Sequence, residues 1–272
     1  MTEDPAAAFV APRRVAMVVK YDGGGFCGFQ RQPGFRTVQE ELETAWAAVS
    51  GERQVVHGSG RTDSGVHAYG QVVHLPAVKR MPAHKIARAM NAYLPDDLAV
   101  RQAVEAPAGF HACQSAVGKH YVFFAATGPE RPVLQRGKVA WIRRPLQLEP
   151  MREALLALIG THDFEAFAAA GRSTTTTIRT ITAAHIQPMR GGLAFHFRGK
   201  GFLYRQVRNM VGSLLEVGYG KRGPQWVANV RDSRDRQRAG ATAPAEGLYL
   251  WRVFYQPNPF TRLCGESGST YP

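Results

Sequence analysis

The stretch that most constrains this chain is Gly58-Ser59-Gly60-Arg61-Thr62-Asp63-Ser64-Gly65-Val66-His67-Ala68. Its glycines permit backbone conformations that other residues avoid, and they let a ligand approach the main chain closely. Asp63 stands among hydroxyl side chains and beside one guanidinium, that of Arg61. A cation near this carboxylate would keep it ionised at neutral pH, which suits a nucleophile better than a general acid. A polar loop whose Asp63 caps its own turn is the competing interpretation.

The segments around this loop predict a repeating order of strands and helices. Short strands are predicted on both sides of the loop, near Gln54 to His57 and near Gln71 to Leu75. An apolar run at residues 14–21 indicates a buried strand, and a capping box at Thr37-Val38-Gln39-Glu40 opens a helix. The apolar stripe of this first helix is Val38, Leu42, Ala45, Trp46 and Val49. A second helix has the apolar stripe Ile86, Ala89, Met90, Tyr93 and Leu94, and Pro95 ends this helix.

With a strand near Leu98 to Ala103, the first half runs β-α-β-β-α-β, and the second half can be interpreted in the same way. Its predicted strands are 119–126, 181–187, 193–197 and 248–255, and its predicted helices are 151–159, 207–215 and a short one around Trp226. We therefore expect an α+β fold of two ferredoxin-like halves that share or appose their sheets in a mostly antiparallel arrangement.

The same order predicts the domain boundaries. Residues 13–108 form an N-terminal ferredoxin-like domain that carries the Asp63 loop, and residues 109–256 form a C-terminal one. The connection between them falls around Pro107 to Ser115. Residues 1–12 and 257–272, rich in Pro, Ala, Gly and Ser, are expected to be tails.

The charge of the chain predicts a polyanionic partner. Among 272 residues, 34 Lys and Arg outnumber 21 Asp and Glu, which leaves a formal net charge of +13. Basic clusters alternate with aromatic residues and do not lie on helices with a large exposed apolar face, so nucleic acid is favoured over a membrane. With no signal peptide and no apolar run of about 18 residues, we expect a cytoplasmic location.

Cofactor and metal patterns are not found. The three cysteines form no C-x-x-C pair, and the nine histidines show no H-x-x-x-H spacing, so no metal site is expected. Gly23 to Gly28 formally match G-x-G-x-x-G, but they do not lead into a helix, which argues against a dinucleotide. Asp63-Ser64-Gly65 also matches the aspartic-protease tripeptide, whose chemistry needs two carboxylates that share a proton.

From about Arg14 to Tyr255 the chain resembles the tRNA pseudouridine synthase A family. The most specific match is Gly60-Arg61-Thr62-Asp63-Ser64-Gly65-Val66-His67. The other matching motifs include Gly28-Phe29-Gln30-Arg31-Gln32, Asn91-Ala92-Tyr93-Leu94-Pro95, Lys119-His120-Tyr121, Val207-Arg208-Asn209-Met210-Val211-Gly212 and Glu246-Gly247-Leu248-Tyr249-Leu250. The resemblance implies the pseudouridine synthase fold and the isomerisation of uridine to pseudouridine at positions 38, 39 and 40 of the tRNA anticodon stem-loop, by a homodimer without a cofactor.

The resemblance also implies roles for particular residues. Asp63 would be the nucleophile, and Arg61 would help to displace the flipped base. Tyr121 would stack on the uracil, and Arg208 would pair with Asp63. The residues expected to bind substrate are Arg31, Lys119 and Leu248.

A non-catalytic protein made of two RNA-recognition-like modules is the alternative. Lys200-Gly201-Phe202-Leu203-Tyr204 partly matches the aromatic signature of such modules, although it follows a predicted strand and lacks the full aromatic set. A binding module has no use for a carboxylate that repels phosphate, so Asp63 favours the enzyme.

Overall fold

The structure is a computed structural model, which describes residues 13–77, 81–171 and 175–260. Its first half contains β1 (Arg13–Tyr21), α1 (Val38–Ser50), β2 (His57–Gly58), β3 (His67–Ala77), α2 (Ala83–Asn91) and β4 (Leu98–Glu105). The strands of its second half are β5 (Ala116–Thr127), β6 (Ala140–Ile142), β7 (Gly160–Asp163), β8 (Ile178–Met189), β9 (Gly192–Gly199) and β10 (Leu248–Tyr255). The helices of this half are α3 (Leu148–Leu156), α4 (Gln206–Gly218) and α5 (Gln225–Ser233).

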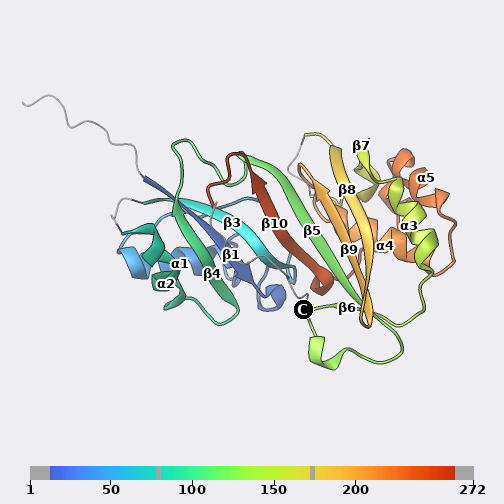
Figure 1. Cartoon of the computed structure of the whole chain (residues 1–272), viewed down its shortest axis with the longest axis horizontal. Helices are drawn as coiled ribbons and strands as arrows, with labels where there is room; N and C mark the ends of the chain where they lie inside the picture. The colour runs from blue at the N-terminus through green and yellow to red at the C-terminus, as the bar shows by residue number, and fades with distance from the viewer. Residues whose placement is uncertain (1–12, 78–80, 172–174, 261–272) are drawn as a thin grey trace, which may run out of the picture.

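The strands form one continuous sheet in the order β4-β1-β3-β10-β5-β9-β8-β7, with β2 paired to β3 and β6 to β5 (Figure 1). Most neighbours are antiparallel, and β10 with β3 and β5 with β6 are parallel. The α+β class and the mostly antiparallel sheet are confirmed. Each half keeps the strand neighbours of a ferredoxin-like unit. In the first half these neighbours are β4-β1-β3-β2, and in the second half they are β10-β5-β9-β8, with β6 and β7 added at its margins.

The two halves meet at β3, whose free edge is divided between two partners. At one end, His74 and Val73 pair with His57 and Gly58 of β2. At the other end, His67 and Ala68 pair with Tyr249 and Leu250 of β10. The loop that carries Asp63 connects β2 to β3, so it emerges at the junction of the halves, in the middle of the sheet.

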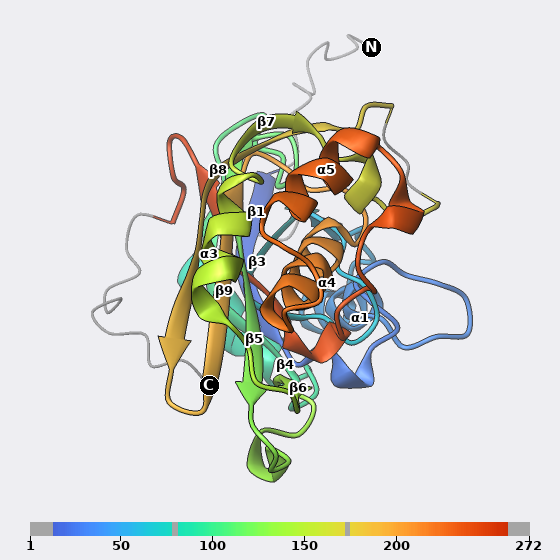
Figure 2. The same cartoon turned by 90° about the vertical axis from the view of Figure 1, so that its right-hand side faces the viewer.

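Helices α1, α4 and α5 lie on one side of this sheet (Figure 2). The predicted stripe of α1 is buried at four of its five positions, and Val49 is partly buried. Every predicted apolar position of α4, from Val207 to Leu215, is buried. The amphipathic patterns therefore predicted correctly which faces of these helices pack on the sheet.

The predicted capping box of α1 is wrong in its chemistry, although the helix begins where expected. The Thr37 side chain makes no capping bond, and its hydroxyl is buried without a hydrogen-bond partner among the described atoms. The first helical amides are bound instead by the preceding loop, since Val38 N donates to Gly28 O at 3.3 Å and Gln39 N donates to Phe29 O at 2.9 Å. A tertiary contact has replaced the local one.

The second predicted helix is shorter than its stripe. Helix α2 ends at Asn91, and Tyr93 is 60% exposed. The Asn91 side chain donates to Val100 O at 2.9 Å and accepts from Val100 N at 2.7 Å. These two bonds fix the end of the helix to β4 before Pro95 is reached.

The predicted domain boundaries remain predictions. The predicted tail 1–12 and residues 261–272 of the predicted tail 257–272 lie outside the described residues. Two features near these boundaries are packed into the core. Phe110 and Ala112 of the expected connection are buried, and Ala112 N donates to His74 Nδ1 at 3.2 Å. Phe260 is also buried, so the chain beyond β10 is attached to the core at least as far as this residue.

Because three histidines are buried, we expect the free energy of unfolding to be lower in mild acid than at neutral pH. Burial, with neighbouring cations, lowers the pKa of His74 and His196 to about 4 and that of His120 to about 3. Below the unfolded-state value near 6.5, the unfolded chain therefore binds protons that the folded chain does not. We expect the free energy of unfolding to fall by roughly 1.4 kcal/mol per pH unit for each such histidine between about pH 6.5 and 4.5.

Urea titrations at pH 7.5, 6.5 and 5.5 measure this dependence. The variant His196→Gln should show a shallower pH dependence, whereas His84→Gln, a change at an exposed histidine, should keep the slope of the unaltered protein. Equal unfolding free energies at pH 5.5 and 7.5 would contradict the expectation.

Candidate active site

The backbone of the Asp63 loop is fixed by close contacts with the segment before α1. Phe29 N donates to Thr62 O at 3.0 Å, and Val66 N donates to Asp63 O at 3.1 Å. Gly28 has a φ of +91°, and a Cβ there would lie 2.9 Å from Thr62 O. Only glycine meets both requirements without strain. The carboxylate is thus carried by a loop with a defined path.

Buried polar side chains hold the start and the middle of the loop. Ser59 Oγ donates to Gln71 Oε1 at 2.6 Å, and Gln71 Nε2 donates to Gly60 O at 2.7 Å. The hydroxyls of Tyr21 and Thr62 share a hydrogen bond of 2.8 Å. Such satisfied buried networks make a loop rigid, so the backbone that carries Asp63 is held in one position.

Lys119, expected to bind substrate, is bonded to this loop in the structure. Its ammonium donates to Ser59 O at 2.8 Å, and burial lowers its pKa. A Cβ at Gly60 would lie 2.8 Å from the Lys119 Nζ atom, so glycine at position 60 makes room for the lysine. The lysine from β5 therefore supports the loop that comes from the first half.

The carboxylate of Asp63 is paired with two arginines that are distant in sequence. Arg208 Nη1 donates to Asp63 Oδ2 at 2.9 Å, and Arg205 Nε lies 3.9 Å from the same oxygen. Among the described residues, these two arginines are the ones that form ion pairs with Asp63. Arg61 is exposed and forms no ion pair with it. The expected pairing of Arg208 is present, whereas the neighbouring cation suggested by sequence adjacency is replaced by one 145 residues away.

Arg208 is held rigidly at the first turn of α4. Its side chain is 12% exposed, and its Nε donates to Ala243 O at 2.7 Å while Ala243 N donates back to Arg208 O at 3.1 Å. The amino end of a helix carries a partial positive charge that favours an anion. Asp63, 16% exposed, therefore lies against a fixed guanidinium at the amino end of this helix.

The segment 239–243 crosses α4 and supplies the carbonyl that orients Arg208. Gly240 N donates to Ser213 Oγ at 2.9 Å, and Thr242 Oγ1 donates to Asn209 Oδ1 at 2.7 Å. Arg236 binds the same amide oxygen at 3.0 Å and the Gly240 carbonyl at 3.1 Å. The sequence analysis missed Arg236 and Thr242, because no pattern in the chain links them to the helix.

Gly212 makes this crossing possible, and its replacement should loosen the site. A Cβ at position 212 would lie 1.7 Å from Ala241 O, a backbone atom that cannot move aside alone. We expect Gly212→Ala to lower the free energy of unfolding by about 1 to 3 kcal/mol, as overpacking does in cores. Thermal and urea unfolding measure the loss. Gly223→Ala, which meets no atom within 4 Å, is the matched control, and equal stability of the two variants would contradict the expectation.

Tyr121 of β5 contributes an aromatic ring near the carboxylate. The side chain is 8% exposed, pairs across the strands with Leu250, and meets Phe202 edge to face with ring centroids 5.1 Å apart. Burial, together with the charges of Tyr21 and Asp63, raises the pKa of its hydroxyl. The ring is therefore neutral at physiological pH and serves as an apolar surface with one polar end.

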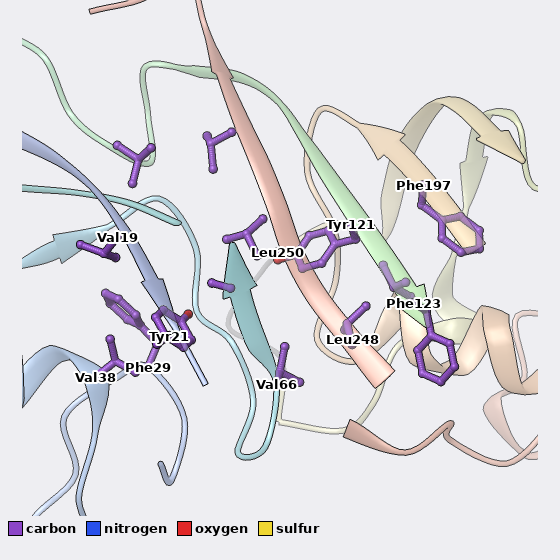
Figure 3. Packing of buried hydrophobic residues seen from close by; sticks show 14 of the residues in the cluster. Val19, Tyr21, Phe29, Val38, Val66, Tyr121, Phe123, Phe197, Leu248 and Leu250 are labelled. Atoms are coloured by element: carbon purple, nitrogen blue, oxygen red, sulfur yellow. The ribbon is translucent and has the colours of Figure 1, made fainter. Parts of the chain in front are cut away.

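The remaining expected substrate-binding residues are placed differently. Leu248 is buried and pairs across the strands with Phe123, whereas Leu250 lies beside the Tyr121 ring (Figure 3). Arg31 is exposed, and its guanidinium pairs with Glu43 at 2.9 Å. The structure thus brings together Asp63, Arg208 and Tyr121, whereas Arg31 and Arg61 form no ion pair with the carboxylate within the described part of the chain.

No group of three or more His, Cys, Asp or Glu side chains among the described residues is arranged to hold a metal ion. No helix in the ranges that the structure describes has the length and apolar character needed to cross a bilayer.

Comparison with known proteins decides the family. The PseudoU_synth_1 family model, described as tRNA pseudouridine synthase, matches residues 17–115 and 154–256. The chain belongs to this family. The Asp63 loop and the Arg208 helix fall inside the matched ranges of the tRNA pseudouridine synthase model, whereas Tyr121 lies between the two ranges.

Curated relatives agree with this assignment over nearly the whole chain. A protein of Geobacillus kaustophilus named tRNA pseudouridine synthase A is 45% identical over 90% of this chain and 95% of its own length. Proteins of the same name from Bacillus subtilis and Nitrosomonas europaea are 46% and 40% identical, each over 89% of this chain and over 99% and 89% of their own lengths. Among solved structures, the crystal structure of a Cbf5-Nop10-Gar1 complex matches with a TM-score of 0.34 and 13% identity, covering 74% of this chain and 45% of that one.

As a tRNA pseudouridine synthase, the protein is an isomerase that acts on uridine in tRNA. The pseudouridine synthase fold expected from the resemblance is therefore confirmed. The alternative of a non-catalytic pair of RNA-recognition-like modules is not favoured.

Proposed function

We propose that this enzyme converts uridine to pseudouridine at positions 38, 39 and 40 of the tRNA anticodon stem-loop, with Asp63 as its nucleophile. The observation that supports this role most directly is the partly exposed Asp63 carboxylate, fixed by Arg208 beside the Tyr121 ring. The reaction breaks the bond from N1 to C1′ and forms one from C5 to C1′. The proton leaves C5 and N1 gains one, so the product is an isomer of the substrate.

The residues act through positioning and charge. Asp63 attacks at C1′ or through another adduct, and Arg208 keeps its oxygen aimed while stabilising the negative charge when the carboxylate is released. Arg61, exposed at the edge of the loop, takes the place of the displaced base in the stem. Leu248, Arg31 and Lys119 remain proposed contacts of the RNA.

Tyr121 offsets the cost of taking the base out of the stem. Extruding a paired uridine costs a few kcal/mol, and stacking on an aromatic ring returns about 1 to 3 kcal/mol. We expect Tyr121→Phe to keep most of the single-turnover rate and Tyr121→Ala to reduce it by roughly 5-fold to 150-fold. Single-turnover assays on one purified tRNA measure both rates. A Phe variant as slow as the Ala variant would show that the hydroxyl, and not the ring, is needed.

The experiment that tests the proposed function uses tRNA labelled with tritium at C5 of uridine. Rearrangement to pseudouridine releases this tritium to water, and sequencing of the treated tRNA locates the modified positions. Release accompanied by pseudouridine at positions 38 to 40 supports the proposal. Pseudouridine confined to other positions, or no release from any tRNA, would refute it.

We also propose that the enzyme works as a homodimer in the cytoplasm, where its tRNA substrates occur. The resemblance to the family suggests the dimer, and exposed apolar residues support it. Leu134 is 95% exposed and Val133 is 72% exposed, on the loop that projects below the sheet between β5 and β6 (Figure 1). Light scattering should give about twice the chain mass of 29.9 kDa, and a monomer at micromolar concentration would refute the dimer.

A further inference from the structure

Arg205, the second cation on Asp63, has an unusual backbone conformation. It precedes α4 with φ of 58° and ψ of 8°, in the left-handed region that residues other than glycine seldom adopt. Arg234 is the other such residue in the described ranges. A conformation of this kind stores backbone strain, and it often marks a functional position.

The two arginines on Asp63 differ in how firmly they are held. Arg208 is 12% exposed and donates hydrogen bonds both to Asp63 and to a backbone carbonyl. Arg205 is 42% exposed, and its Nε lies 3.9 Å from the carboxylate, beyond hydrogen-bond distance. Its guanidinium carbon lies 5.0 Å from the centre of the Tyr204 ring, which is itself 40% exposed. Arg205 is therefore close to the carboxylate but free to exchange it for another anion.

The substrate brings such an anion to the same place. Each nucleotide carries a phosphate diester about one sugar away from its base, and a base that reaches Asp63 brings its phosphate near the mouth of the site. The Asp63 carboxylate repels that phosphate, whereas the amino end of α4 attracts it. A guanidinium binds phosphate through two parallel N–H groups, which it cannot do with Asp63 at 3.9 Å.

We propose that Arg205 changes partner when tRNA binds. In the free enzyme it faces Asp63, and in the complex it binds the phosphate diester of the nucleotide whose base is turned out. Arg208 then remains as the cation that positions the carboxylate. This inference rests on the proposed function of Asp63, and it assigns to Arg205 the recognition of the RNA backbone at the reacting nucleotide.

The test uses Arg205→Gly, because glycine accepts the left-handed backbone without strain. We expect the dissociation constant of tRNA and the KM to rise by roughly 10-fold to 100-fold, the effect of losing hydrogen bonds to a charged group. The rate at saturating tRNA should change by less than about threefold. The slope of log binding constant against log salt should become shallower by about 0.7 to 0.9, the loss of one phosphate contact.

Three further variants make the result specific. Arg205→Lys keeps the charge and should retain most of the salt slope. Arg234→Gly removes the other left-handed arginine and controls for the effect of this substitution on folding. Arg222→Gln removes one exposed positive charge from the segment that follows the carboxyl end of α4, a helix about 20 Å long. If Arg222→Gln weakens tRNA binding as much as Arg205→Gly does, the loss of affinity comes from net charge and the proposal is wrong.

Two other outcomes would overturn the inference. One is a fall in the saturating rate with affinity and salt slope unchanged, which would make Arg205 a positioning residue for Asp63 alone. The other is a folded Arg205→Gly enzyme that matches the unaltered one in every readout. Affinity and salt slope are measured by equilibrium binding without turnover, so they test the role of Arg205 even if no pseudouridine forms. A lack of pseudouridine would refute only the proposed function.

Discussion

Asp63→Asn is expected to bind tRNA at least as tightly as the unaltered enzyme and to form pseudouridine at a rate lower by roughly 10⁴-fold or more. The amide has the shape of the carboxylate but is neither charged nor nucleophilic. Binding is retained because the change removes a negative charge that repels the RNA backbone. Single-turnover tritium release and filter binding on the same tRNA measure the two effects.

Asp163→Asn is a matched control for this substitution. Asp163 is 22% exposed and pairs with Arg234 at 3.0 Å, so its environment resembles that of Asp63, which is 16% exposed and pairs with Arg208 at 2.9 Å. The control variant should keep the rate of the unaltered enzyme. A folded Asp63→Asn enzyme that releases tritium at more than about a tenth of that rate would exclude Asp63 as the nucleophile.

Arg208→Met is the second substitution with a large expected effect, and it should impair both folding and catalysis. It leaves the carboxylate of Asp63, mostly buried, without the guanidinium at 2.9 Å, and it removes the bond to Ala243 O. Breaking a buried ion pair from one side costs about 3 to 5 kcal/mol, and losing a preorganised donor lowers rates by roughly 10² to 10³. Urea unfolding and single-turnover rates at a temperature where the variant is folded measure these losses.

A double-mutant cycle separates the pair from its surroundings. If the pair is the cause, Asp63→Asn combined with Arg208→Met should destabilise the protein by less than the sum of the single changes, because the unpaired charge is gone. Arg208→Lys should recover only part of the rate, since a lysine cannot bind Asp63 and Ala243 O together. Additive destabilisation would show that Arg208 acts through packing and not through Asp63.

The order of elements could be predicted from the sequence because it depends on local patterns. Apolar stripes such as that of α4 and apolar runs such as residues 14–21 reflect burial on one face or both, which is a property of neighbouring residues. The order β-α-β-β-α-β in each half then implied the ferredoxin-like units. Elements of two to four residues, such as β2, β6 and β7, were too short to be recognised or placed accurately in this way.

Features that depend on contacts between distant residues could not be predicted from the residues alone. Arg61 is adjacent to Asp63 in sequence, yet the loop turns it outward and α4 supplies the cations. Arg208 was expected only through resemblance, because from its pattern a solvated helix arginine was equally reasonable. Nothing local predicted that the carbonyls of Gly28 and Phe29 would replace the Thr37 cap, or that Arg205 would adopt a left-handed conformation.

The place of β10 has a consequence for biosynthesis. This strand is the last element within the described residues, yet it lies between β3 and β5 and joins the two halves of the sheet. A ribosome that stops before residue 248 releases a product that carries the Asp63 loop and the α4 arginines but lacks the strand between the two halves. Its uncovered β3 and β5 edges can pair with other chains. We therefore expect a product that lacks β10 to be inactive and prone to aggregate.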